Sequence, residues 1–122
     1  MTPRALPAAF VALSMIGLSL WANQASAEAP AVDAAAGKQL YDRNCLACHG
    51  AAGAGDGPAS RALRPPPTAF NTAAFWTDKK PAEVKAAIRS GRPGTSMMAF
   101  GSLDDAELNN VVAYLRSLAP TE

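Results

Sequence analysis

Both cysteines and the only histidine of this 122-residue chain lie in one short motif, Cys45, Cys48 and His49, spaced as C-x-x-C-H. Two thiols separated by two residues can each form a thioether with one vinyl group of the same porphyrin. The histidine that follows then lies under the ring, where its imidazole can bind the iron. This spacing is the attachment motif of a c-type haem. The sequence therefore predicts one covalently bound haem with His49 as an axial ligand.

Other interpretations of the motif fit the chain less well. A dithiol redox site of the thioredoxin kind would belong to a βαβ unit, and no strand pattern of any length is present. A structural zinc site needs four ligands, and the sequence holds no further Cys or His. In an oxidising compartment the two thiols could form a disulfide, but the histidine that follows them favours haem attachment.

The first 27 residues have the pattern of a secretory signal peptide. Arg4 supplies the positive charge, residues 8–21 are mostly apolar, and Ala25-Ser26-Ala27 matches a small-x-small cleavage site. The apolar run is shorter than the roughly 20 residues that span a bilayer, which argues against a retained anchor. We expect cleavage after Ala27, export to the periplasm and no stable membrane anchor, so that residues 28–122 form one domain.

The expected mature domain carries no net charge. The chain has 11 Lys and Arg against 10 Asp and Glu, and Arg4 is the only charged residue before position 28. Such a balance lacks the basic excess that nucleic-acid binding requires. A domain of this size buries limited apolar surface and usually needs a staple. We expect the haem to supply the missing part of the core.

Apolar spacing predicts an all-α domain with three main helices and long loops around one haem. The first helix should run from an N-cap at Asp33 to about Asn44. Residues 50–67 are rich in Gly and Pro and predict a loop, with short turns expected at 59–63 and 71–76.

Two further helices follow. The second should begin at Thr77 or Asp78 and end at Gly91. The third should begin at Ser102, with Asp105 as the acid of a capping box.

The second axial ligand has to come from elsewhere in the chain. The candidates are Met97, Met98, a lysine, or no residue at all. Filling gaps in a core is the commonest role of methionine, but two adjacent methionines in a Gly/Pro-flanked loop favour ligation. A thioether is a soft ligand that stabilises Fe(II) and raises the reduction potential.

Several ordered motifs resemble one family. Residues 37–41 read G-K-Q-L-Y, residues 49–58 contain H-G-x-x-G-x-G-D-G-P, residues 94–97 read G-T-S-M, and a last helix carries Tyr114. Over most of residues 37–118 the chain resembles the class I cytochrome c family. The resemblance is greatest to small bacterial monohaem cytochromes and to the c-type subunits of respiratory oxidases and dehydrogenases. It implies the cytochrome c fold.

The resemblance also implies roles for single residues. Met97 aligns with the ligand methionine, although the family usually has proline where this chain has Met98. Pro58 resembles the proline whose carbonyl accepts a hydrogen bond from the ligand histidine. Gly37 and Tyr114 resemble the pair at which the first and last helices cross. The expected haem-binding residues are Cys45, Cys48, His49, Pro58 and Met97, of which His49 and Met97 would bind the iron.

Basic and aromatic side chains surround the second helix. The basic ones form either a docking patch for an acidic redox partner or an ordinary solvated helix face; they are Lys79, Lys80, Lys85, Arg89 and Arg92. We expect Trp76 and Phe100 to line the haem pocket, and Phe70 and Phe75 to belong to the core.

The resemblance implies an electron carrier that is not an enzyme and that passes single electrons to and from redox partner proteins, and the expected signal peptide places it in the periplasm. Its donor and acceptor are not evident from the sequence. One alternative is an electron-transfer subunit of a larger oxidoreductase. Another is an open-site haem enzyme or gas sensor, which is disfavoured because no distal His or Arg constellation is present.

Overall fold

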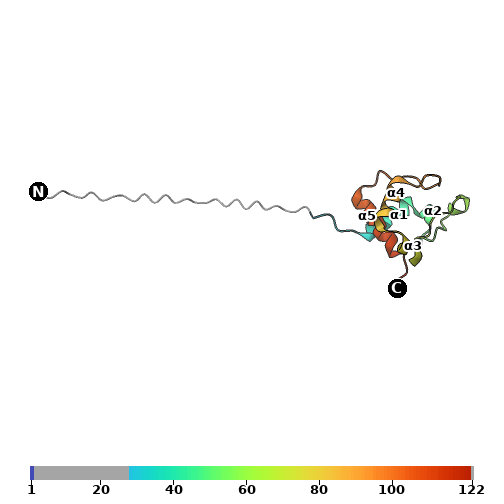
Figure 1. Cartoon of the computed structure of the whole chain (residues 1–122). Coiled ribbons are helices and arrows are strands. Elements are labelled where there is room, and N and C mark those ends of the chain that lie inside the picture. The colour runs from blue at the N-terminus through green and yellow to red at the C-terminus, as the bar shows by residue number, and fades with distance from the viewer. Residues whose placement is uncertain (2–27, 122) are drawn as a thin grey trace.

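The computed structural model describes Met1 and residues 28–121, and this part of the chain contains helices and no strand. The all-α prediction is therefore confirmed (Figure 1). Residues 2–27, which carry the expected signal peptide, lie outside the described residues. The elements are α1 (Ala34–Asn44), α2 (Leu46–His49), the 3₁₀ turn η1 (Ser60–Ala62), α3 (Ala73–Asp78), α4 (Pro81–Ser90) and α5 (Asp105–Ser117). None of the helices described is long and apolar enough to cross a membrane.

Helices α1 and α5 pack closely against each other (Figure 1). A Cβ at Gly37 would overlap the Asn110 carbonyl group of α5, so only glycine allows the two backbones to approach this closely. Along the same crossing the rings of Tyr41 and Tyr114 pack edge to face, with centroids 5.2 Å apart. The predicted positions of Gly37 and Tyr114 are thus confirmed.

The first helix begins where the sequence predicts. The Asp33 carboxylate accepts hydrogen bonds from the backbone N–H groups of Ala35 at 2.8 Å and Ala36 at 3.2 Å, which satisfies two donors at the helix start. The Asp33 N–H donates to the side-chain oxygen of Asn110 at 2.8 Å. The start of α1 is therefore tied to α5.

The predicted start of the second helix is wrong. Residues 73–78 already form α3, so the turn expected at 71–76 is a short helix capped by Thr72. Lys80 is extended, because a proline disfavours the helical conformation of the residue before it. Helix α4 therefore begins at Pro81, and the Glu83 carboxylate accepts a hydrogen bond from the Lys80 N–H at 2.8 Å. The predicted end at Gly91 is confirmed.

The third helix also begins later than predicted. Asp104, not Ser102, is the N-cap of α5. The Asp104 carboxylate accepts from the Glu107 N–H at 2.8 Å, and the Glu107 carboxylate accepts from the Asp104 N–H at 2.9 Å. This reciprocal pair is a complete capping box, so Asp105 becomes the first residue of the helix instead of its capping acid.

The apolar core is small. Helices α1, α4 and α5 supply most of it, and α3 adds one tryptophan. The buried apolar side chains are Leu40, Tyr41, Trp76, Val84, Ile88, Leu108, Val111, Val112 and Leu115. This core does not fill the whole interior, and side chains of α4 and of the long loops line a cavity beside it.

Candidate haem-binding site

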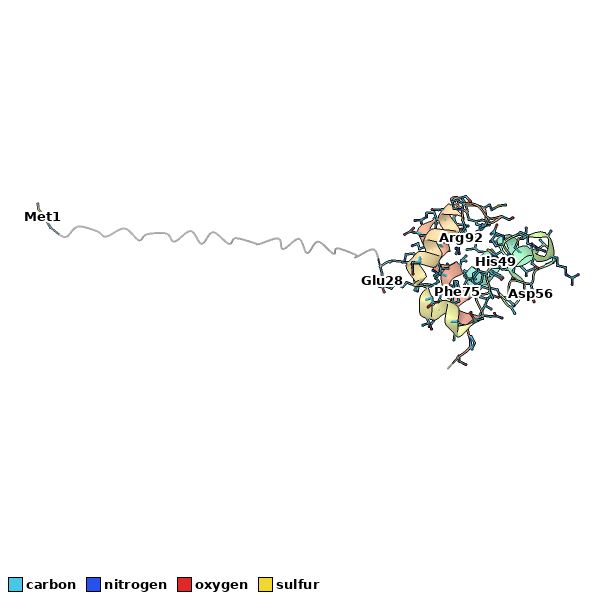
Figure 2. The ribbon with its side chains drawn as sticks, turned by 45° about the vertical axis from the view of Figure 1, so that its right-hand side comes forward. Met1, Glu28, His49, Asp56, Phe75 and Arg92 are labelled. Carbon is cyan, nitrogen blue, oxygen red and sulfur yellow. The ribbon has the colours of Figure 1, made fainter. Side chains whose placement is uncertain are left out.

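A cavity of about 850 Å³ lies between the α1–α2 junction, helix α4 and the loops that follow η1 and α4. Its volume lies in the upper part of the range for small-molecule and cofactor sites, about 300–1,000 Å³. Its lining includes Cys45, Cys48, His49 and Met97. Figure 2 labels three lining residues, His49, Phe75 and Arg92, which come from α2, α3 and the loop after α4. The structure thus brings the C-x-x-C-H motif and Met97 to one cavity.

Local helix geometry places the motif. The Cys45 N–H donates to the Tyr41 carbonyl at 2.8 Å, and the N–H groups of Cys48 and His49 donate to the Cys45 carbonyl at 3.2 and 2.9 Å. Residues three and four positions apart lie on the same side of a helix. The spacing therefore turns both thiols and the imidazole toward the same cavity.

The two thiols are available for covalent attachment of a haem. Both cysteines are free and partly buried. Burial, together with nearby Cys48, raises the pKa of Cys45 to about 11. A reactive redox dithiol needs a lowered pKa, because the thiolate is the nucleophile. The environment of Cys45 therefore argues against a thioredoxin-like site.

His49 is held in the form that binds a metal. The imidazole is 9% exposed, and its Nδ1 lies 3.0 Å from the Thr68 carbonyl oxygen. With Nδ1–H donating to this oxygen, Nε2 keeps its lone pair for a metal ion. Burial lowers the pKa of His49 and outweighs the opposite effect of the Thr68 carbonyl. The neutral imidazole, which is the ligand form, is thus favoured.

The role predicted for Pro58 is wrong. The carbonyl that accepts from His49 belongs to Thr68, and Pro58 is exposed. The Gly57 N–H donates to the Cys48 carbonyl at 3.1 Å, and the Ala59 N–H donates to the Ala47 carbonyl at 2.9 Å. These bonds hold the turn around Pro58 against the backbone of α2, and the chain reaches the imidazole only later, at Thr68.

The two methionines differ in burial. Both line the cavity. Met97 is partly buried and packs against the core, whereas Met98 is 67% exposed. The family resemblance distinguishes the two methionines by position, and the structure distinguishes them by burial.

The aromatic lining differs in part from the prediction. Phe100 lines the cavity as expected, but Trp76 does not. The Trp76 Nε1–H donates to the Phe70 carbonyl at 2.7 Å, and the Arg116 guanidinium lies 5.1 Å from the tryptophan ring centroid. Phe70 and Phe75 are partly buried and line the cavity instead. The Phe70 ring packs on His49, with centroids 4.5 Å apart.

The basic residues around α4 do not act as one patch. The Asp105 carboxylate forms ion pairs with both Arg89 and Lys85. The Lys85 Nζ lies 3.0 Å from this carboxylate and also donates a hydrogen bond to the Asn109 side-chain oxygen at 2.9 Å. Arg89, and then Lys85, lower the pKa of the Asp105 carboxyl. These contacts join α4 to α5. Lys79 and Arg92, in contrast, line the cavity.

The donor set fits a covalently attached haem. One imidazole, two free thiols and one partly buried thioether line a cavity whose walls include Val84, Ile88 and other apolar side chains. The part of the chain that the structure describes contains no group of three or more His, Cys, Asp or Glu that could hold a metal ion by itself.

Comparison with known proteins agrees with this site. The family model described as cytochrome c matches residues 34–119. The chain is 38% identical over 109 residues to dihydro-heme d1 dehydrogenase of Pseudomonas aeruginosa, covering 88% of this chain and 19% of that protein. It is 32% identical over 96 residues to the CcoP subunit of the cbb3-type cytochrome c oxidase of Azospirillum brasilense, covering 79% of this chain and 31% of that protein. It is 34% identical over 90 residues to cytochrome c6 of Picosynechococcus, covering 73% and 76%.

Solved structures show the same similarity. A chain of the reducing HAO-like protein complex of Kuenenia stuttgartiensis matches with a TM-score of 0.61 and 26% identity, covering 69% of this chain and 41% of that one. The solved structure of dihydro-heme d1 dehydrogenase matches with a TM-score of 0.56 and 36% identity, covering 71% of this chain and 16% of that one. The chain thus spans less than half of either structure and less than a third of the first two curated relatives.

Proposed function

Because the chain belongs to the cytochrome c family and is a class I c-type cytochrome, with covalently bound haem c and haem-based electron transfer, we propose that it is a periplasmic carrier of single electrons and not an enzyme. The observation that carries the proposal is the cavity that Cys45, Cys48, His49 and Met97 line together. When bound there, the haem iron supplies the one-electron change between Fe(III) and Fe(II).

In this proposal Cys45 and Cys48 would attach the haem through thioether bonds, and His49 and Met97 would bind its iron. The hydrogen bond from His49 to the Thr68 carbonyl supports the first ligand, because it orients the ring and raises its basicity. The partial burial of Met97 supports the second. A soft thioether favours the reduced state and suits a carrier of relatively high potential.

We propose export on the basis of the first 27 residues. A single positive charge, an apolar run and Ala25-Ser26-Ala27 make up the pattern of a cleavable signal. In this proposal residues 1–27 are removed and residues 28–122 form the haem domain in the periplasm.

We propose that redox partners dock at the mouth of the cavity. Arg43, Lys79 and Arg92 line it, and none of the three forms an ion pair among the described residues. Lys85 and Arg89, in contrast, are paired with Asp105. An acidic partner surface would complement the unpaired cations and be steered toward them.

The docking proposal can be tested with a small anionic reductant, hexacyanoferrate(II). Its rate of electron transfer should fall in Lys79→Gln and Arg92→Gln and decline with added salt. Lys38→Gln is the control, because Lys38 pairs with Asp42 on α1 at 2.6 Å and does not line the cavity. Equal effects of all three changes would refute a local docking surface.

The carrier function is tested by the state of the sixth position. Wild-type protein should show the weak charge-transfer band of methionine-bound ferric haem, and the reduced protein should bind CO poorly. Rapid CO binding without the band would contradict the proposal and favour an open-site enzyme or gas sensor.

A second candidate is an electron-transfer subunit of a larger oxidoreductase. Two relatives are several times longer than the matched region, since the match covers 19% and 31% of their lengths. Gel filtration of a native periplasmic extract separates the two functions. A haem signal at the size of a single domain supports a free carrier, and elution with much larger proteins supports a subunit.

A further inference from the structure

The loop that carries Met97 begins with an unusual backbone turn at Gly91. Gly91 ends α4 with φ 69° and ψ −173°. This combination is essentially restricted to glycine, because a Cβ would clash with the local backbone. The turn directs the chain away from α4 and into the segment that lines the cavity.

The far end of the loop folds back onto the bare α-carbon of Gly91. A Cβ at position 91 would lie 2.7 Å from the Met97 carbonyl oxygen, 2.8 Å from the Ala99 nitrogen and 2.9 Å from the Met98 carbonyl carbon. All three are backbone atoms, which cannot move aside by a rotamer change. The Arg92 N–H also donates to the Met97 carbonyl at 3.0 Å. Met97 is thus seated against Gly91.

Thr95 fixes the other side of the Met97 peptide. Its hydroxyl accepts a hydrogen bond from the Met97 N–H at 3.1 Å and donates one to the Arg92 carbonyl at 2.7 Å. Beyond Met97, the Phe100 N–H donates to the Ile88 carbonyl of α4 at 3.0 Å. Both backbone groups of Met97 are therefore held by residues of the same loop.

We propose that Gly91, assisted by the Thr95 hydroxyl, is the positioning residue that sets where the Met97 thioether lies in the cavity. The proposal rests on the proposed ligation by His49 and Met97. A side chain at position 91 would push the backbone of residues 97–99 away from α4. The sulfur would move with it, and the sixth position would become easier for an outside ligand to reach.

The same loop provides a matched control. Gly94 also has a positive φ, 78°, but no atom outside residues 93–95 lies within 4 Å of a Cβ placed there. Alanine at position 94 would therefore also have to adopt a positive φ, but without contacting residues 97–99. A comparison of Gly91→Ala with Gly94→Ala separates displacement of Met97 from loss of a flexible residue.

The test uses haem-loaded full chain and imidazole as the probe ligand. Ferric Gly91→Ala should bind imidazole about tenfold to a hundredfold more tightly than wild type, which corresponds to about 1.4–2.8 kcal/mol. Its methionine charge-transfer band should weaken, and its reduction potential should fall. Gly94→Ala should match wild type in all three, even if both variants lower the unfolding temperature.

A second pair of variants covers the case in which Gly91→Ala does not mature. Thr95→Val should weaken the band and tighten imidazole binding, whereas Thr95→Ser, which keeps the hydroxyl, should restore wild-type behaviour. Equal imidazole affinities for the two glycine variants, or for Val and Ser at position 95, would overturn the inference. A wild-type protein without the band would refute the proposed ligation itself, whatever the glycine variants do.

Discussion

The buried hydroxyl of Tyr41 offers a sharp test of how the haem motif is held. Tyr41 is 0% exposed, and its hydroxyl donates to the Gly50 carbonyl at 2.6 Å, directly after His49. The same carbonyl also accepts from the Gly53 N–H at 3.2 Å, so Tyr41→Phe would leave it with one partner. We therefore expect a loss at the lower end of the range for buried hydrogen bonds, about 1 kcal/mol of unfolding free energy.

The assays are guanidinium unfolding and thermal unfolding of the haem-loaded protein, each followed by circular dichroism. For a domain of this size a loss of 1 kcal/mol should lower the thermal midpoint by about 4–8 °C. Tyr114→Phe is the control, because its ring packs on Tyr41 but its hydroxyl makes no hydrogen bond to a described residue. That variant should change the free energy by less than about 0.5 kcal/mol. Equal losses in the two variants would refute the reasoning.

Three further predictions follow from the same structure. Gly37→Ala should destabilise the domain by more than about 2 kcal/mol, because the new methyl overlaps the backbone of α5; a change below 1 kcal/mol would contradict the close crossing. Burial raises the pKa of Tyr41, so the stability that its protonated hydroxyl contributes should be fully present below about pH 10 and be lost at higher pH. The unfolding midpoint of Tyr41→Phe should therefore fall less at high pH than the midpoint of wild type, and equal falls would contradict this. Chain produced without haem should be largely unfolded by circular dichroism, because the apolar core is small; native-like helix content would refute this.

The chemistry of the site could be read from the sequence because it depends on local spacing. Cys45, Cys48 and His49 lie on one side of a single helical turn, and no tertiary contact is needed to bring them together. The apolar stripes of the main helices and the cap at Asp33 are also local features. The role of Gly37 could be predicted from the family resemblance, and the close approach of its backbone to α5 explains why this position needs glycine.

The errors at the site lie where tertiary contacts decide. The acceptor of the His49 hydrogen bond is a backbone carbonyl, and any residue can supply one, so no side chain marked Thr68. Trp76 and Phe75 are neighbours on α3, and only the packing of that short helix shows which of them lines the cavity. The start of α4, in contrast, depends on a local feature: Pro81 disfavours a helical conformation at Lys80, so the helix begins at Pro81 and not at the predicted Thr77 or Asp78.

The central claim is that one haem is attached to Cys45 and Cys48 and that His49 and Met97 bind its iron. The most direct measurement is the methionine charge-transfer band of ferric protein in Met97→Ala and Met98→Ala, with CO binding to the reduced forms. We predict that Met97→Ala abolishes the band, opens the site to CO and lowers the reduction potential, whereas Met98→Ala leaves all three unchanged. Loss of the band in Met98→Ala but not in Met97→Ala would contradict the account.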